Sequence, residues 1–329
     1  MVTEPGYDST PCVVVVNSSR GQPTHRQEPY ELRPSSARTH RAAVAPMRHR
    51  YGVAVTEIRG RATEGVIVVQ GRPVGYVSWS GGDRGTPVLL LHGVTDSAEC
   101  WDPVARVLAD GRLVVGVDAR GHGRTPLGDQ PFTIAALADD AAAVLSAVAD
   151  RPALVIGHSM GGLAAQELAL ARPDLVAALV LEEPAWSAGE PATDQGVPEF
   201  LLTFLPSFAG VDAQRLAARA RRENPGWSED EIGPWARSKT QVDQRLTRVP
   251  HDWRGRDWVE SLTGVGVAVT LVTGEPSLGS VVTPAEIERA SALLGDRLVH
   301  VPLAGAGHNP RRDDPSGYLD AVDAALARL

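Results

Sequence analysis

One pentapeptide constrains the fold of this chain more than any other feature. Residues 157–161 read Gly-His-Ser-Met-Gly and directly follow the apolar run 153–156. A serine between two glycines at the end of an apolar strand is typical of a strained strand-to-helix turn, because the glycines put no side chain into the tight bend. Residues 162–165 continue as a helix whose amino end faces Ser159. The pattern predicts a nucleophile elbow that exposes the Ser159 hydroxyl to a substrate.

Three more short motifs follow apolar runs of the kind that forms buried strands. His92 and Gly93 come after the run 87–91, the sequence DARGHGRT comes after 113–117, and the sequence GAGHNP comes soon after 298–302. This order of an HG turn, a DxRGHGxS/T turn, a GxSxG elbow and a late GxGH resembles the α/β-hydrolase family. Four motifs in one order make the resemblance specific.

The resemblance covers about residues 66 to 329, apart from a middle insertion. The same region alternates strand-like apolar runs with helix-like segments, which favours a mostly parallel sheet with right-handed crossovers. We therefore expect the α/β-hydrolase fold, in which a mostly parallel eight-stranded sheet is flanked by helices and carries a helical cap insertion.

The chain is expected to divide into four parts. Residues 65–184 and 265–329 hold the alternating elements and form the two parts of the core. Residues 185–264 hold several helical stretches and most of the tryptophans, and they resemble the family's helical cap over the strand ends. Residues 1–64 mix Pro, Ser, Arg, His and Glu with little periodicity, which predicts a largely disordered N-terminal extension.

Charge and composition exclude several classes of function. With a net charge of -8 and no basic stripe, the chain lacks the features of a nucleic-acid-binding protein. Its apolar runs are far shorter than the roughly 20 residues that cross a bilayer, and no secretory signal is recognised at its start. It shows no phosphate-binding loop, disulfide framework or zinc ligand set. We expect a cytoplasmic protein that acts on a small molecule without cofactor or metal; the oligomeric state stays open.

A serine hydroxyl needs help to act as a nucleophile near neutral pH. A neutral imidazole must accept its proton, and a carboxylate must orient and charge-balance that imidazole. Among the nine histidines, His308 lies on a short loop after the last strand, where the fold can bring a ring over the elbow. His92, His122 and His158 belong to motif turns, for which structural roles are expected. Ser159 and His308 are therefore the candidate nucleophile and base.

The position of the carboxylate that would orient His308 departs from the commonest family pattern. In most relatives the strand before the final helix-strand pair ends in G-x-x-D, but here Ser277 stands at the position of the acid. Some haloalkane dehalogenases and lactonases place the acid instead after the strand that follows the elbow helix, about two dozen residues beyond the nucleophile. Glu183 follows Ser159 by 24 residues and is the predicted acid. Glu182 and Glu275 remain the alternatives.

The resemblance also implies an oxyanion hole and a pocket. The donors would be the backbone N–H groups of Val94, after the HG turn, and Met160, after the nucleophile. By their places in the sequence, His158, Trp101 and Trp186 are candidate pocket residues. A wider set of tryptophans could contribute to the same pocket, namely Trp227, Trp235, Trp253 and Trp258.

These residues predict a cofactor-independent serine hydrolase that cleaves an ester or lactone of a small hydrophobic substrate through an acyl-enzyme. Carbon-carbon bond hydrolysis and thioester cleavage use the same triad, and the sequence does not separate them. A different class is a hydrolase-fold protein that binds or senses a small molecule with little turnover. Ser277 in place of the usual acid keeps that alternative open.

Overall fold

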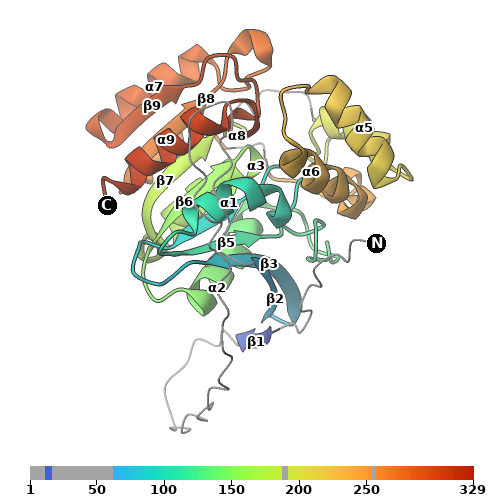
Figure 1. Ribbon diagram of the computed structural model, residues 1–329, viewed down its shortest axis with the longest axis horizontal. Helices are drawn as coiled ribbons and strands as arrows, with labels where there is room; N and C mark the ends of the chain where they lie inside the picture. Colours follow the sequence, from blue (N-terminus) through green and yellow to red (C-terminus); the bar gives the residue numbers. More distant parts are fainter. Residues whose placement is uncertain (1–11, 17–61, 187–191, 254–255) are drawn as a thin grey trace, which may run out of the picture.

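A computed structural model describes residues 12–16, 62–186, 192–253 and 256–329. Their strands form a single sheet in the order β1-β2-β3-β5-β4-β6-β7-β8-β9 (Figure 1). Pairing is antiparallel for β2 with β3 and for β3 with β5, and parallel elsewhere. The strands are β1 (Cys12–Val16), β2 (Ala62–Val69), β3 (Arg72–Ser80), β4 (Val88–Leu91), β5 (Leu113–Val117), β6 (Ala153–His158), β7 (Val176–Glu182), β8 (Ala268–Thr273) and β9 (Leu298–Pro302).

The expected fold is confirmed, with one addition at the edge of the sheet. Strands β2 to β9 are the eight expected strands, and β1 is a ninth that pairs in parallel with β2. It lies in the segment 1–64, for which a largely disordered chain was expected, so the expectation is wrong for residues 12–16 and for residues 62–64, which begin β2. Consecutive valines, which are β-branched, favour an extended backbone, and β2 offers them an open edge. The remainder of that expectation concerns residues 1–11 and 17–61, which lie outside the described residues.

Helices cover both faces of the sheet (Figure 1). Side chains alternate along each strand, so Leu89 and Leu91 pack with α2 and α3 on one face, while Val88 and Leu90 pack with α1 and α9 on the other. The core helices are η1 (Ala98–Trp101), α1 (Asp102–Leu108), α2 (Ile134–Val148), α3 (Met160–Ala171), η2 (Pro173–Leu175), η6 (Pro276–Leu278), α7 (Pro284–Leu294), η7 (Gly295–Arg297), α8 (Pro310–Asp313) and α9 (Pro315–Leu326).

The region 185–264, assigned to a cap, contributes short helices between β7 and β8. These are α4 (Glu199–Phe204), η3 (Leu205–Phe208), α5 (Ala213–Glu223), α6 (Glu229–Gln241), η4 (Gln244–Thr247) and η5 (Glu260–Gly264). Asp212 caps α5 and Ser228 caps α6, each accepting a hydrogen bond from a backbone N–H of the first turn. These two N-cap residues fix where the helices begin and therefore which side chains face the core.

The register of the parallel strands brings their carboxyl ends to one edge. Leu91 lies opposite Gly157, Gly157 opposite Leu181, and Leu181 opposite Leu271. The segments that follow β4, β6, β7 and β8 therefore leave the sheet side by side. Open α/β sheets bind their ligands at this edge.

Candidate active site

Ser159 lies in the turn between β6 and α3 with φ 52° and ψ -115°, a conformation that non-glycine residues rarely adopt. The turn is so tight that a Cβ on Gly157 would lie 2.2 Å from the carbonyl oxygen of Gly161, which explains a glycine at that place. Backbone strain of this kind costs about 1–3 kcal/mol and is common at functional sites. The surrounding structure holds it, since the Ser159 N–H donates to the carbonyl oxygen of Glu182 at 3.0 Å.

Glu183, the first residue after β7, also has a positive φ of 45° and a fully buried side chain. Its carboxylate accepts hydrogen bonds from the N–H of Gly274 at 2.9 Å, the hydroxyl of Ser280 at 2.7 Å and the N–H of Val281 at 2.7 Å. Its Oε2 lies 3.4 Å from Nδ1 of His308. Burial alone would raise the pKa of Glu183, but these four donors outweigh it and lower the pKa. The carboxylate is held ionised beside an imidazole.

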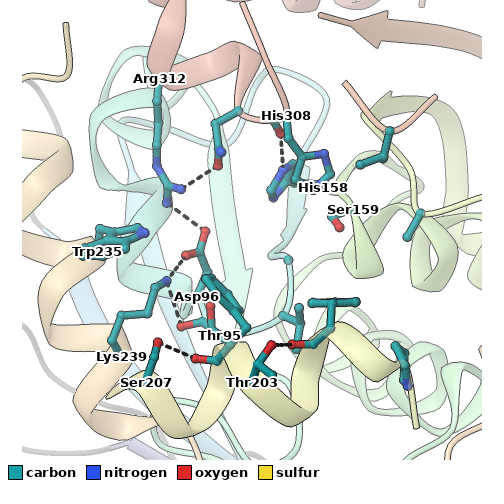
Figure 2. Close-up of a pocket in the computed structure, with 18 of the residues that line it drawn as sticks. Thr95, Asp96, His158, Ser159, Thr203, Ser207, Trp235, Lys239, His308 and Arg312 are labelled. Atoms are coloured by element: carbon teal, nitrogen blue, oxygen red, sulfur yellow. Dashed lines mark hydrogen bonds and ion pairs between the residues drawn. The ribbon is translucent and has the colours of Figure 1, made fainter. Parts of the chain in front are cut away.

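His308 lies in the loop between β9 and α8, and its side chain is 30% exposed. Two carboxylates brace that loop: Asp313 accepts from the Gly307 N–H at 2.9 Å, and Glu275 accepts from the Gly305 N–H at 2.7 Å. Since Nδ1 faces Glu183, Nε2 is the ring nitrogen that can serve a partner in the cavity. Ser159 and His308 both line this cavity. Figure 2 shows Ser159 beside the rings of His158 and His308.

The other two candidate acids have different partners. Glu182 is fully buried and accepts two hydrogen bonds from the Arg311 guanidinium, both 3.2 Å long. Burial raises the pKa of Glu182 despite that cation. Glu275 binds the Gly305 N–H and the Ser277 hydroxyl. Of the three glutamates, Glu183 is the one with a hydrogen bond to His308 among the described residues.

The two expected oxyanion donors flank the elbow. Met160 is the first residue of α3, where a helix leaves its backbone N–H groups without intrahelical partners. Val94 lines the cavity and follows Gly93, on which a Cβ would lie 2.7 Å from Nδ1 of His158. The next residue, Thr95, donates its N–H to Nε2 of His122 at 3.1 Å. The HG turn therefore packs closely on the elbow.

His92 and His122 hold turns, as expected. His92 accepts from the Ala119 N–H at 3.0 Å, and His122 donates to the Arg120 carbonyl oxygen at 2.9 Å. Burial, together with neighbouring His92, lowers the pKa of His122 to about 3, so its Nε2 stays an acceptor.

Between the carboxyl edge of the sheet and the helices α4 to α6 lies a cavity of about 650 Å³. Its wall includes Ser159, His158 and His308 from the core together with four aromatic side chains, namely Phe200, Phe204, Trp235 and Trp253. The volume suits a small organic molecule. Of the three candidate pocket residues, only His158 lines this cavity.

Trp101 and Trp186 were expected in the pocket, and the structure contradicts this. Trp101 is fully buried on the face of the sheet that α1 and α9 cover, where the guanidinium of Arg311 lies 4.2 Å from its ring centroid. Trp186 is buried in the core and donates from Nε1 to Gln166 at 3.0 Å. Nearness to the elbow along the sequence does not determine the direction of a side chain.

Sequence reasoning also missed a buried ionic cluster beside the cavity. Asp96, which follows the HG turn, accepts from Lys239 of α6 and from Arg312 of α8, both at 2.7 Å (Figure 2). It also accepts from Arg311 of α8 at 3.0 Å. Arg312 also bonds Glu231 of α6 at 3.2 Å. Burial would raise the pKa of Asp96, but the three cations hold it well below its usual range. One carboxylate thus joins the HG turn, the segment after His308 and the cap.

Two further properties of the described residues bear on the site. No group of three or more His, Cys, Asp or Glu side chains among them is arranged to hold a metal ion. No helix within the described part of the chain is both long and apolar enough to cross a membrane.

The fold and the elbow define a class of protein. A family model described as the alpha/beta hydrolase fold matches residues 86–263, more than half of the chain. The chain belongs to the α/β-hydrolase family.

Named relatives agree with this assignment. The chain is 35% identical over 201 residues to lipase LipV of Mycobacterium tuberculosis, covering 56% of this chain and 72% of that protein. It is 35% identical over 128 residues to the sn-1-specific diacylglycerol lipase ABHD11 of Xenopus tropicalis, but that match covers 38% of this chain and 39% of the lipase. These names support a hydrolase.

Solved structures share the fold at low sequence identity. E-2-(acetamidomethylene)succinate hydrolase has a TM-score of 0.67 and 22% identity, with coverage of 81% of this chain and 100% of that one. The N-formylmaleamic acid deformylase of Pseudomonas putida has a TM-score of 0.66 and 24% identity, with coverage of 79% and 100%. At this level of identity they show the fold alone.

Proposed function

We propose that this protein is a cofactor-independent serine hydrolase that cleaves an ester or lactone of a small hydrophobic substrate through an acyl-enzyme. One observation carries the proposal: the buried, ionised Glu183 lies 3.4 Å from His308 Nδ1, and His308 and the elbow residue Ser159 line one cavity. A nucleophile, a base and an acid that orients the base are the parts that acyl transfer needs.

The first half of the reaction forms the acyl-enzyme. Ser159 Oγ attacks the carbonyl carbon while His308 Nε2 takes the hydroxyl proton, and Glu183 stabilises the resulting imidazolium through its contact with Nδ1–H. Negative charge then collects on the carbonyl oxygen, where the backbone N–H groups of Val94 and Met160 are the proposed donors. His308 returns its proton to the leaving oxygen, and the bond to the leaving group breaks.

The second half releases the acid. Water enters the cavity and gives a proton to His308 Nε2 as its oxygen attacks the acyl carbon. The tetrahedral intermediate collapses, the bond to Ser159 Oγ breaks, and the proton returns to that oxygen. The enzyme is restored without a redox step or a further reactant.

The lining of the cavity supports a substrate with an apolar part. Phe200, Phe204, Trp235 and Trp253 provide aromatic surface within the same cavity as Ser159. Among the relatives, two are named as lipases. Ester and lactone carbonyls both fit the proposed chemistry.

A fluorophosphonate probe and a substrate screen test the proposal together. We expect the wild-type protein to be labelled, and the Ser159→Ala variant, checked for folding by its melting temperature, to lose the label. In parallel, p-nitrophenyl esters of increasing chain length and aromatic lactones are offered to both proteins. Turnover that depends on Ser159 supports the hydrolase. Folded wild-type protein that neither reacts with the probe nor turns over any substrate would favour a binding protein instead.

A further inference from the structure

His158 is the last residue of β6 and immediately precedes Ser159, so its backbone is part of the elbow. Its side chain is 4% exposed and lines the cavity. Ring Nε2 lies 2.8 Å from the backbone carbonyl oxygen of His308 and donates to it. The two imidazole rings are in contact, with centroids 4.9 Å apart and an interplanar angle of 45° (Figure 2). One side chain therefore joins the segment of the nucleophile to the segment of the base.

The same ring also packs on the HG turn. A Cβ on Gly93 would lie 2.7 Å from His158 Nδ1 and 3.3 Å from Ser159 Cβ, so the turn before Val94 rests directly on both residues. His158 thus fills the space where the elbow, the HG turn and the His308 loop meet.

His308 needs an anchor of this kind. Its side chain is 30% exposed, and its contact with Glu183 is 3.4 Å, long for a hydrogen bond. The braces from Asp313 and Glu275 act on Gly307 and Gly305 rather than on His308 itself. Among the hydrogen bonds of the described residues, the bond from His158 Nε2 is the one that reaches the backbone of the candidate base directly.

We propose that His158 is a positioning residue, whose Nε2–H bond to the backbone of His308 sets the distance between the Ser159 hydroxyl and the His308 ring. The inference rests on the proposed serine-hydrolase function and adds to it a residue that takes no part in proton transfer. Misplacing a reacting group by about 1 Å can cost about 100-fold in rate, so an anchor at this point affects kcat more than binding.

The chemistry of the ring agrees with this role. A carbonyl oxygen can only accept, so Nε2 must carry the proton, and the buried Nδ1 has no hydrogen-bond partner among the described residues. Burial, followed by the charges of Arg311 and His308, holds the pKa of His158 well below its usual value. The ring stays neutral, and it therefore adds no positive charge against His308 when that residue accepts a proton.

Two substitutions of similar size separate the effect of the hydrogen bond to His308 from the effect of side-chain packing. Gln and Met have similar length and volume, but only Gln keeps an N–H donor that can reach the His308 carbonyl. For a p-nitrophenyl ester we expect His158→Met to lower kcat by about 10- to 100-fold with KM changed less than about threefold. His158→Gln should recover most of that kcat. Melting temperatures report the stability of both variants.

Each other outcome counts against the proposal. Equal losses of kcat in the two variants, or no loss in either, would show that the donated bond does not position His308. A Met variant that fails to fold would assign His158 to stability instead. If wild-type protein itself shows neither turnover nor probe labelling, the proposed function fails, and histidine ring signals from ¹⁵N NMR still decide the positioning: the His308 signals should move in the Met variant and stay in the Gln variant.

Discussion

Glu182 and Glu183 are adjacent in the chain, yet their carboxylates serve different partners. Glu182 binds the guanidinium of Arg311, whereas Glu183 binds three donors in the segment between β8 and α7 and faces His308. The change follows from the backbone, because β7 ends at Glu182 and Glu183 adopts a φ of 45°. Two buried acids at one strand end can therefore have separate roles, one in stability and one in the proposed triad.

Removing the charge of Glu183 should mainly affect the chemical step. In Glu183→Gln the amide keeps the shape but cannot stabilise the His308 imidazolium, and by analogy with other triads kcat should fall about 1,000- to 10,000-fold. Glu182→Gln is the neighbouring control, and it should lower the melting temperature more than it lowers kcat. Steady-state kinetics and thermal melts of both variants check this. Activity lost in Glu182→Gln and retained in Glu183→Gln would exchange the two assignments.

Glu275→Gln tests the later strand as the source of the acid. Glu275 accepts from the Gly305 N–H, and an amide oxygen can accept the same bond. We expect kcat to stay within about threefold of the wild type, since no proton or charge at His308 changes. A loss comparable to that of Glu183→Gln would move the acid to the loop after β8.

Much of the fold could be predicted because local patterns decide it. Continuous apolar runs marked the buried strands, and the glycines around Ser159 marked the turn. The cap was harder. Within residues 185–264 the sequence indicates several helical stretches but not where each one ends. In the structure α6 ends at Gln241, Val242 is extended, and Asp243 starts a separate turn as the N-cap of η4. A β-branched residue followed by Asp was the local sign of that break.

One choice at the candidate site followed from a spacing in the sequence. The spacing of 24 residues from Ser159 was enough to favour Glu183, and its contact with His308 agrees with that choice. The ionic cluster was not predictable in the same way, because Asp96 and Arg312 are 216 positions apart and Lys239 comes from the cap. Such contacts depend on how distant elements pack, which no local pattern encodes.

Asp96 should make the stability of the protein depend on acid pH. Its pKa is lowered in the folded state, so it contributes stability above its unfolded value of 3.8, and that contribution is lost as pH falls towards the folded value. Asp96→Asn leaves the buried cations under-compensated and should cost about 3–5 kcal/mol at pH 7. Below about pH 4 the difference in unfolding free energy between the wild type and the variant should narrow by about 1.4 kcal/mol per pH unit.

Urea unfolding of both proteins at several pH values measures that gap. Asp243→Asn is a suitable control, since Asp243 pairs with Arg245 at the surface and such pairs contribute about 0–1 kcal/mol. A gap that stays constant from pH 7 to pH 3 would contradict a stabilising, ionised Asp96.

Helix α4 provides a matched pair for testing the substrate side of the cavity. Phe204 and Leu202 are similarly exposed, at 36% and 41%, but only Phe204 lines the cavity. If the aromatic wall binds the apolar part of the substrate, Phe204→Ala should raise KM for a long-chain p-nitrophenyl ester by about 5- to 10-fold, equivalent to about 1 kcal/mol of lost contact. Leu202→Ala should leave KM near the wild-type value, and neither variant should change KM for the acetate ester. A rise in KM that is equal for short and long chains, or equal in both variants, would show that the acyl chain does not lie along Phe204.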